Sequence, residues 1–212
     1  QDEIGEKELL VVSFGTSYND SRRETIGAIE KAMQTAFPDY SVRRAFTSQI
    51  IIDHVKDRDG VTIDNVEQAL ERAVNNGVKT LVVQPTHLMN GLEYEELTDE
   101  LAKYSDSFEK IAIGDPLLTS DADFEAVMTA ITDATKDAAD GKTAICFMGH
   151  GTTADSNSVY SKMQTLLTDK DSMTGRIEDA GLDAKELPGC SEENWKALAD
   201  VIDVLVPASS EY

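Results

Sequence analysis

The sequence predicts an α/β protein with parallel sheets flanked by helices. Short apolar runs of strand length alternate along the chain with longer segments in which apolar residues recur every three to four positions. This alternation is typical of βαβ units, in which a helix returns the chain to the next parallel strand. The chain has 212 residues, 41% of them hydrophobic, and is therefore long enough to bury a sizeable core.

The predicted strands are short runs rich in β-branched and other apolar residues. They lie at Leu9–Phe14, Ser41–Phe46, Thr80–Gln84, Lys110–Ile113, Thr143–Met148 and Val201–Val206. The predicted helices have the longer period. They lie at Asp20–Ala36, Ile63–Asn75, Tyr94–Tyr104, Asp121–Ala138, Ser156–Leu167, Asp171–Ala180 and Glu192–Ala199. The elements over residues 8–118 should form one doubly wound lobe, in which ligands bind beyond the carboxyl ends of the strands.

The first predicted helix shows the apolar period most clearly. Its residues Ile26, Ile29, Met33 and Phe37 are three to four positions apart, which predicts one buried face. A further short helix is indicated around His54, and the pattern places that histidine on its polar side.

A second lobe is predicted to begin near Thr143, because a strand–turn–helix pattern recurs there. When Leu9–Val12 is aligned with Ile145–Met148, the turn Gly15-Thr16-Ser17 falls on Gly151-Thr152-Thr153. A duplication explains this match, and so does the general need for small residues at such turns. Too few residues follow for a complete second lobe, so we expect this lobe to be reduced or partly missing.

Charge and composition exclude several classes of protein. The 19 basic and 40 acidic residues give a formal net charge of −21, which would repel a phosphate backbone and excludes nucleic acid as a partner. The sequence has no glycine-rich loop of the kind that holds nucleotide phosphates. It also has no apolar run near the roughly 18 residues that a membrane-spanning helix needs. The 2 cysteines make no disulfide framework.

Two histidines stand directly after predicted strands and are candidates for chemistry. His150 lies between Gly149 and Gly151, which allow a sharp turn and leave the imidazole uncovered. A neutral ring nitrogen there can bind a divalent metal or accept a proton. His87 follows another strand and should lie at the same edge of the sheet, where imidazole is a suitable neighbour for haem or another tetrapyrrole. For both, a hydrogen-bonded histidine at a turn is the alternative.

Several motifs occur in a characteristic order along the chain. They are Leu10–Tyr18, Arg44–Ser48, His87–Glu95 and Phe147–Gly151, with Arg58-Asp59-Gly60 and Pro116-Leu117-Leu118 in place between them. Together they resemble the anaerobic, early-cobalt sirohydrochlorin cobaltochelatase family. The resemblance spans about residues 8–168.

The resemblance implies two chelatase-like lobes around a tetrapyrrole cleft. It also implies a lyase of cobalamin synthesis that inserts a divalent metal into sirohydrochlorin, or a related tetrapyrrole, without ATP. In the family the histidine of the Gly-His-Gly motif coordinates the metal and helps to remove pyrrole protons, and this role falls on His150. The substrate-binding residues implied are Phe14, Gly15, Thr16, Ser17, His87, Met89, Asn90 and Gly91. In some members the histidine at the position of His87 is associated with haem.

The metal and the activity have alternatives. Co²⁺ is the expected substrate metal, with Fe²⁺ or Ni²⁺ as alternatives, and haem is a further candidate ligand. The family's second metal-binding histidine and a glutamate are not found after Thr168, and the chain has 3 histidines. A non-catalytic tetrapyrrole-, haem- or metal-binding protein on the same fold is therefore the alternative to an enzyme. A homo-oligomer is left open.

The predicted organisation has three parts. A polar lead covers residues 1–7, an N-terminal lobe with its crossover helix covers 8–141, and an incomplete C-terminal lobe covers 142–212. The lead begins with Gln1 rather than Met, so we expect that an upstream segment was removed. This expectation favours an exported and anchored protein outside the cytoplasm over a cytoplasmic one.

Overall fold

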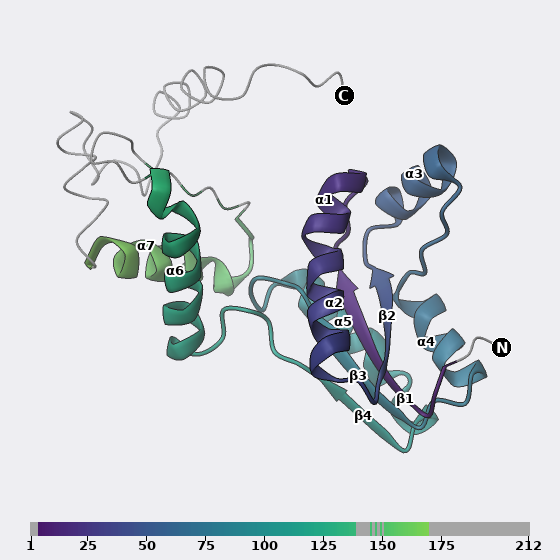
Figure 1. Ribbon diagram of the computed structural model, residues 1–212. Coiled ribbons are helices and arrows are strands. Elements are labelled where there is room, and N and C mark those ends of the chain that lie inside the picture. Colours follow the sequence, from purple (N-terminus) through teal and green to yellow (C-terminus); the bar gives the residue numbers. More distant parts are fainter. Residues whose placement is uncertain (1–3, 139–144, 146, 148, 150, 170–212) are drawn as a thin grey trace. The chain divides into compact units, whose positions relative to one another are not determined.

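A four-stranded parallel sheet organises the first part of the chain. The computed structural model describes residues 4–138, 145, 147, 149 and 151–169. The strand order is β2-β1-β3-β4, and every neighbouring pair is parallel (Figure 1). The strands are β1 (Lys7–Ser13), β2 (Ser41–Phe46), β3 (Thr80–Pro85) and β4 (Lys110–Ile113). The four strands predicted over this part of the sequence are therefore confirmed.

Helices connect the strands and continue beyond them. They are α1 (Asn19–Glu24), α2 (Ile26–Ala36), α3 (Gln49–Asp59), α4 (Val66–Asn75), α5 (Leu92–Ala102), α6 (Asp121–Thr135) and α7 (Ser158–Asp169). Short 3₁₀ turns lie at Ser105–Ser107, Lys136–Ala138 and Asp155–Asn157. The helix predicted at Ser156–Leu167 corresponds to α7. Most of the predicted strand Thr143–Met148, and every element predicted after Asp169, lies outside the described residues.

The described residues divide into two compact units. The first contains the sheet and runs to Phe124, and it also includes Thr152–Asn157. The second contains most of α6 together with α7. The predicted duplication of residues 9–36 in 145–168 stays a prediction, because the residues of its second strand lie largely outside the described part.

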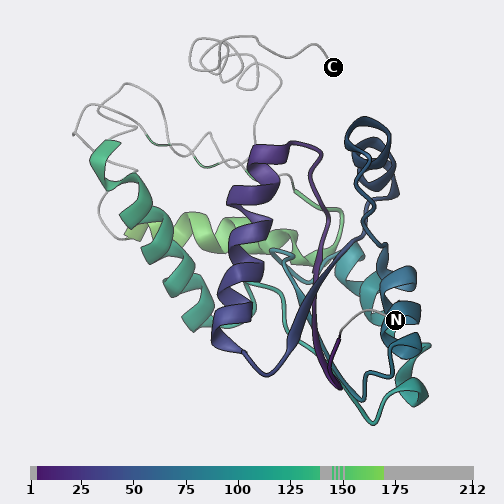
Figure 2. The same ribbon diagram turned by 45° about the vertical axis from the view of Figure 1, so that its right-hand side comes forward.

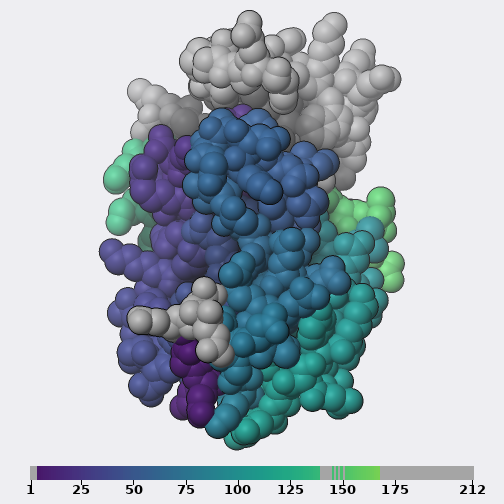
Figure 3. Space-filling view, turned by 90° about the vertical axis from the view of Figure 1, so that its right-hand side faces the viewer, coloured from purple at the N-terminus to yellow at the C-terminus, as the bar shows by residue number. Residues whose placement is uncertain are grey.

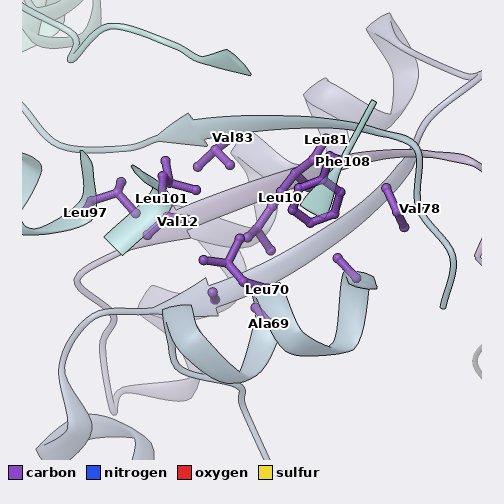
Figure 4. Close-up of a cluster of buried hydrophobic side chains, with 12 residues drawn as sticks. Leu10, Val12, Ala69, Leu70, Val78, Leu81, Val83, Leu97, Leu101 and Phe108 are labelled. Atoms are coloured by element: carbon purple, nitrogen blue, oxygen red, sulfur yellow. The ribbon is translucent and has the colours of Figure 1, made fainter. Parts of the chain in front are cut away.

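Alternate residues of β1 point to opposite faces of the sheet, and each face is covered by helices. On one face Leu10 and Val12 pack with Leu81 and Val83 of β3 against α4 and α5, as Figure 4 shows. On the other, Phe46 of β2 packs with apolar residues of α2 and α3. Figure 2 shows α1 and α2 on one side of the strands and α4 on the other. The predicted doubly wound lobe is thus confirmed for this unit.

The first predicted helix is interrupted at Thr25. The hydroxyl of Thr25 donates to the carbonyl of Ser21 at 2.7 Å, and such back-bonding bends a helix. The backbone of Thr25 accordingly departs from helical values, with φ −106° and ψ −79°, and α1 ends there. Of the face predicted to be buried, Ile26 is buried, but Ile29 and Phe37 are 38% and 46% exposed. The predicted continuous helix and its fully buried face are therefore wrong.

A polar pair joins α2 to the edge strand β2. The guanidinium of Arg44 on β2 donates two hydrogen bonds of 2.6 Å to the carboxylate of Glu30 on α2. This pair forms part of the contact between α2 and β2.

The helix predicted at Ile63–Asn75 begins three residues later, at Val66. Asn65 and Gln68 form a capping box in which each side chain accepts from the other's backbone N–H, at 2.9 and 3.1 Å. The carbonyl of Asp64 accepts from the N–H of Phe46 at 3.0 Å, so the preceding residues extend the edge of β2 and cannot be helical. Figure 3 views this unit from the side of α3 and α4, whose residues cover that face. His54 is exposed on α3, as predicted.

The order of the strands creates a switch point between β1 and β3. The chain moves from β1 outward to β2, and then crosses back over β1 to β3. The loops that leave β1 and β3 therefore run in opposite directions and open a crevice at the carboxyl ends of the strands. Thr86 ties the two strand ends together, because its hydroxyl donates to the hydroxyl of Ser13 at 2.8 Å.

Gly15 allows the loop after β1 to turn tightly over the end of β2. Its φ is +104°, and a Cβ atom at this position would lie 2.6 Å from Cδ2 of Phe46, which is fully buried. An alanine would suffer both backbone strain and a clash with a side chain that has little room to move.

We expect Gly15→Ala to lower the free energy of unfolding by about 3 kcal/mol, from strain and overpacking together. The matched control is Gly77→Ala, because Gly77 has φ +77° but nothing within 4 Å of a Cβ. The control should lose only about 1 to 2 kcal/mol, the cost of the left-handed backbone. Urea denaturation of both variants measures the difference. Equal losses would contradict the role given to Phe46.

Candidate functional site

A pocket of about 310 Å³ lies at the switch point between β1 and β3. Its lining comes from the carboxyl ends of these two strands, from α2 and from the first turn of α5. The lining residues are Ser13, Phe14, Gly15, Ile26, Thr86, His87, Leu88 and Glu93. Parallel α/β sheets bind their ligands at this place, so the pocket is the candidate functional site.

Backbone hydrogen bonds hold the floor of the pocket. The N–H of Thr86 donates to the carbonyl of Val12 at 2.8 Å, which extends the pairing of β3 with β1 by one residue. The carbonyl of Ser13 accepts from Thr47 at 2.9 Å, which extends the pairing with β2. Ser13 is 2% exposed, and its hydroxyl is used by Thr86. The chain segments that follow Ser13 and Thr86 therefore begin at fixed positions.

His87 is the titratable group closest to that floor. Its side chain is 9% exposed, and its Nε2 lies 3.4 Å from a carboxylate oxygen of Glu93. This distance is that of an ion pair and is long for a hydrogen bond. Neither ring nitrogen has a hydrogen-bond partner among the described residues. The backbone carbonyl of His87 accepts from Leu117 at 3.0 Å, which fixes the residue independently of its ring.

Two opposing effects set the protonation of His87. Burial lowers the pKa of His87 below its ordinary value of 6.5, because the charged form loses its hydration. The carboxylate of Glu93 opposes this effect but does not reverse it, since half of that side chain is in water. The ring is therefore neutral near pH 7. A neutral, buried imidazole with unused nitrogens can accept a proton or ligate a metal.

Glu93 reaches the pocket from the start of α5. This helix begins at Leu92, two residues before the predicted start, because the carbonyl of Gly91 already accepts from Tyr94 and Glu95. Glu93 and Glu95 lie in the first turn of this helix, where the helix dipole favours carboxylates. However, Glu93 also lines the pocket beside His87, and the sequence analysis did not select it. The signal was its position two residues after the turn at Gly91.

Only some of the residues expected to bind substrate line the pocket. Phe14, Gly15 and His87 line the pocket. Thr16 and Ser17 follow in the same loop, where their carbonyls accept from arginine side chains. The remaining three are Met89, which is buried, Asn90, which is exposed, and Gly91, which is the N-cap of α5. Their contact with a substrate stays a prediction.

His150 lies outside the described residues, but the segment that follows it is described. The hydroxyl oxygens of Thr152 and Ser156 lie 3.7 and 3.8 Å from the position that a Cβ atom would take on Gly91. Thr152 is held by its own loop, because its N–H donates to Asn157 at 3.1 Å. The residues after the Gly-His-Gly motif therefore pack on the same helix start that carries Glu93.

A second pocket, of about 490 Å³, lies at the edge of β2 and contains three arginines. Its charges are already balanced. Arg44 is paired with Glu30, and Arg72 donates to Asp64 at 2.6 and 2.8 Å. Arg43 lies 3.5 Å from the fully buried Glu8. Because each arginine has a carboxylate beside it, its charge is largely offset within the chain, and this pocket is a weaker candidate.

Two features are absent from the described part of the chain. No group of three or more His, Cys, Asp or Glu side chains is placed to hold a metal there. None of its helices combines the length and the apolar character needed to cross a bilayer.

The family model and the curated relatives that match this chain agree with one another. Residues 7–180 match the family model described as cobalt chelatase (CbiK). The chain is 35% identical over 162 residues to a sirohydrochlorin cobaltochelatase of Salmonella typhimurium, covering 76% of this chain and 61% of that protein. It is 29% identical over 163 residues to the sirohydrochlorin cobaltochelatase CbiKC of Nitratidesulfovibrio vulgaris, covering 76% and 57%. The chain thus spans about three fifths of the length of these curated relatives.

Among solved structures, a cobalamin biosynthesis CbiX protein from Marinobacter aquaeolei VT8 matches with a TM-score of 0.41 and 12% identity. That match covers 62% of this chain and 97% of the other.

The lowered pKa of His87 predicts a pH dependence of stability. Because the unfolded chain binds this proton more tightly than the folded chain, the free energy of unfolding should fall as pH falls below about 6.5. Above that value His87 contributes no pH dependence. Urea denaturation at about pH 7.5 and about pH 5.5 measures the difference.

His87→Gln should make that difference smaller, while His54→Gln, a change of an exposed histidine, should leave it unchanged. A difference that persists fully in His87→Gln would show that another group is responsible.

Proposed function

Because the chain belongs to the cobalt chelatase (CbiK) family, we propose that it inserts Co²⁺ into sirohydrochlorin, without ATP, in cobalamin synthesis. The observation that carries this proposal is the pocket at the switch point, where a buried neutral histidine and a carboxylate meet apolar walls. The names of the two curated relatives support the same substrate and the same metal. Fe²⁺ and Ni²⁺ are the other metals to test.

The chemistry of insertion matches this set of groups. A tetrapyrrole binds a divalent metal through its four nitrogens and releases the two protons of its pyrrole N–H groups. Groups that accept protons near pH 7 are therefore needed next to the macrocycle. Nε2 of His87 is such an acceptor, and the Glu93 carboxylate can stabilise the imidazolium that forms. Phe14 and Leu88 offer apolar surface to the macrocycle, since both line the pocket and are partly exposed.

His150 has the metal-holding role in this proposal. The match of the Gly-His-Gly motif to the family assigns this role. His150 would hold Co²⁺ through a neutral ring nitrogen or accept a pyrrole proton. The family assignment does not favour the non-catalytic tetrapyrrole- or haem-binding protein, which becomes an outcome of the tests. The oligomeric state and the location in the cell stay predictions.

The first test is substitution of His150. We expect His150→Ala to abolish Co²⁺ insertion into sirohydrochlorin, measured by the change in absorption of the macrocycle, while its affinity for sirohydrochlorin changes by less than about 1.5 kcal/mol, the scale of one hydrogen bond. His54→Ala is the matched control and should insert Co²⁺ normally, because His54 is exposed on α3. Full insertion by His150→Ala would remove this residue from the mechanism. Binding without insertion by the unaltered protein would favour the non-catalytic alternative.

The second test separates Glu93 from its neighbours on α5. Glu93→Gln removes the charge beside His87 and should lower kcat at least about tenfold, the lower end of the effect of losing a general acid or base or its partner. Glu96→Gln removes the same charge from an exposed position of the same helix and should leave kcat within about twofold. Equal effects of the two substitutions would show that only the overall charge of α5 matters.

A further inference from the structure

The loop from β1 to α1 carries part of the pocket, and its two halves are held in different ways. The first half is held by the sheet, because the carbonyl of Phe14 accepts from Ser48 at 3.2 Å and Gly15 packs on Phe46. The second half, Thr16–Tyr18, leaves the sheet. Backbone carbonyls that leave a sheet need other donors to hold them.

Two arginines supply these donors. Nη1 of Arg22 on α1 donates to the carbonyl of Thr16 at 3.2 Å. Nη2 of Arg58 donates to the carbonyl of Ser17 at 2.6 Å. Both guanidinium groups also donate to Oδ1 of Asn19, at 2.6 and 3.0 Å. The two arginines therefore share one acceptor at the start of α1.

Arg58 is the long-range member of this pair. It lies at the end of α3, 41 residues after Ser17, and α3 lies beyond the carboxyl ends of the strands (Figure 1). Its Nε and Nη2 donate to the carboxylate of Asp59 at 2.8 and 2.6 Å, and Nη2 of Arg22 lies 3.8 Å from the same carboxylate. The Arg58 guanidinium lowers the pKa of Asp59 to about 2, so this carboxylate stays charged and orients the fork at physiological pH.

We propose that Arg58 is a positioning residue for the tetrapyrrole pocket, which it serves by anchoring the β1–α1 loop through the carbonyl of Ser17. Arg58 does not line the pocket, so it acts through the loop that presents Phe14 and Gly15. This inference rests on the proposed function for the identity of the ligand. The anchoring itself depends only on the hydrogen bonds of the loop.

A planar guanidinium group is needed at position 58, because several hydrogen-bond acceptors surround it. Lysine offers a single ammonium group, which can reach Ser17 or Asp59 but cannot pair with Asp59 through two parallel bonds at the same time. Arg58→Met removes all of these donors while keeping a long apolar side chain. Arg23→Met is the matched control, because Arg23 is 68% exposed on α1 and pairs with Asp20 and Glu24 instead of the loop.

Hydrogen exchange and steady-state kinetics of the full chain together test the proposal. In Arg58→Met the amides of residues 15–19 should exchange about tenfold faster, the effect of losing one charge-assisted hydrogen bond, while the amides of β3 and α4 are unchanged. The KM for sirohydrochlorin should rise about fivefold to tenfold with kcat within about twofold, because ground-state and transition-state binding weaken together. Arg58→Lys should give intermediate values, and Arg23→Met should match the unaltered protein.

Each contrary outcome points to a different failure. Unchanged exchange over residues 15–19 in Arg58→Met would overturn the anchoring role, whatever the chain catalyses. Faster exchange with an unchanged KM would overturn the link between the loop and the pocket. If the unaltered protein inserts no Co²⁺, the proposed function fails, and absorbance titration with sirohydrochlorin alone then decides whether Arg58 governs binding. If Arg58→Met does not fold, the same comparisons with Arg58→Lys decide.

Discussion

Strand β1 pairs in parallel with both β2 and β3, and the position of every group in the candidate site depends on this double pairing. The pairing makes Ser13 and the end of β3 neighbours, so that the hydroxyls of Ser13 and Thr86 can bond. The chain after Ser13 must then turn toward β2, and the chain after Thr86 must turn the other way. Only a residue without a side chain fits over Phe46 at the first turn, which accounts for Gly15.

Burial lowers the pKa of His87, and the charge of Glu93 raises it. Which effect is larger depends on how exposed each of the two side chains is. The ring is almost fully removed from water, whereas the carboxylate of Glu93 is 47% exposed and therefore screened. Desolvation of the imidazolium is the larger effect, and the pKa is lowered. The imidazole is thus neutral near pH 7 and can accept a proton or bind a metal.

The sequence predicted the elements that depend on local patterns and missed the features that depend on distant partners. The four strands of the first unit and the place of His87 at their carboxyl edge follow from runs of apolar residues alone. The exposure of Ile29 could not be predicted in this way, because it depends on which distant parts of the chain pack against α2. The tie between Arg58 and Ser17 spans 41 residues and has no local periodicity. Glu93 had a complete explanation as a helix-start carboxylate, and only the fold shows that it also faces His87.

The charges of the first unit also bear on how a cation and a macrocycle reach the pocket. The chain has a formal net charge of −21, yet its arginines in this unit are directed to carboxylates and carbonyls of the chain itself. Their charges are therefore largely offset by neighbouring carboxylates. A negative field raises the local concentration of a divalent cation over distances of about a Debye length, roughly 8 Å at physiological salt. It does nothing to attract an acidic macrocycle, so binding of the macrocycle has to come from shape and apolar contact. The fixed position of the loop with Phe14 then matters more than any long-range attraction, because a gap of about 0.5 to 1 Å already forfeits about a quarter to a half of a contact's energy.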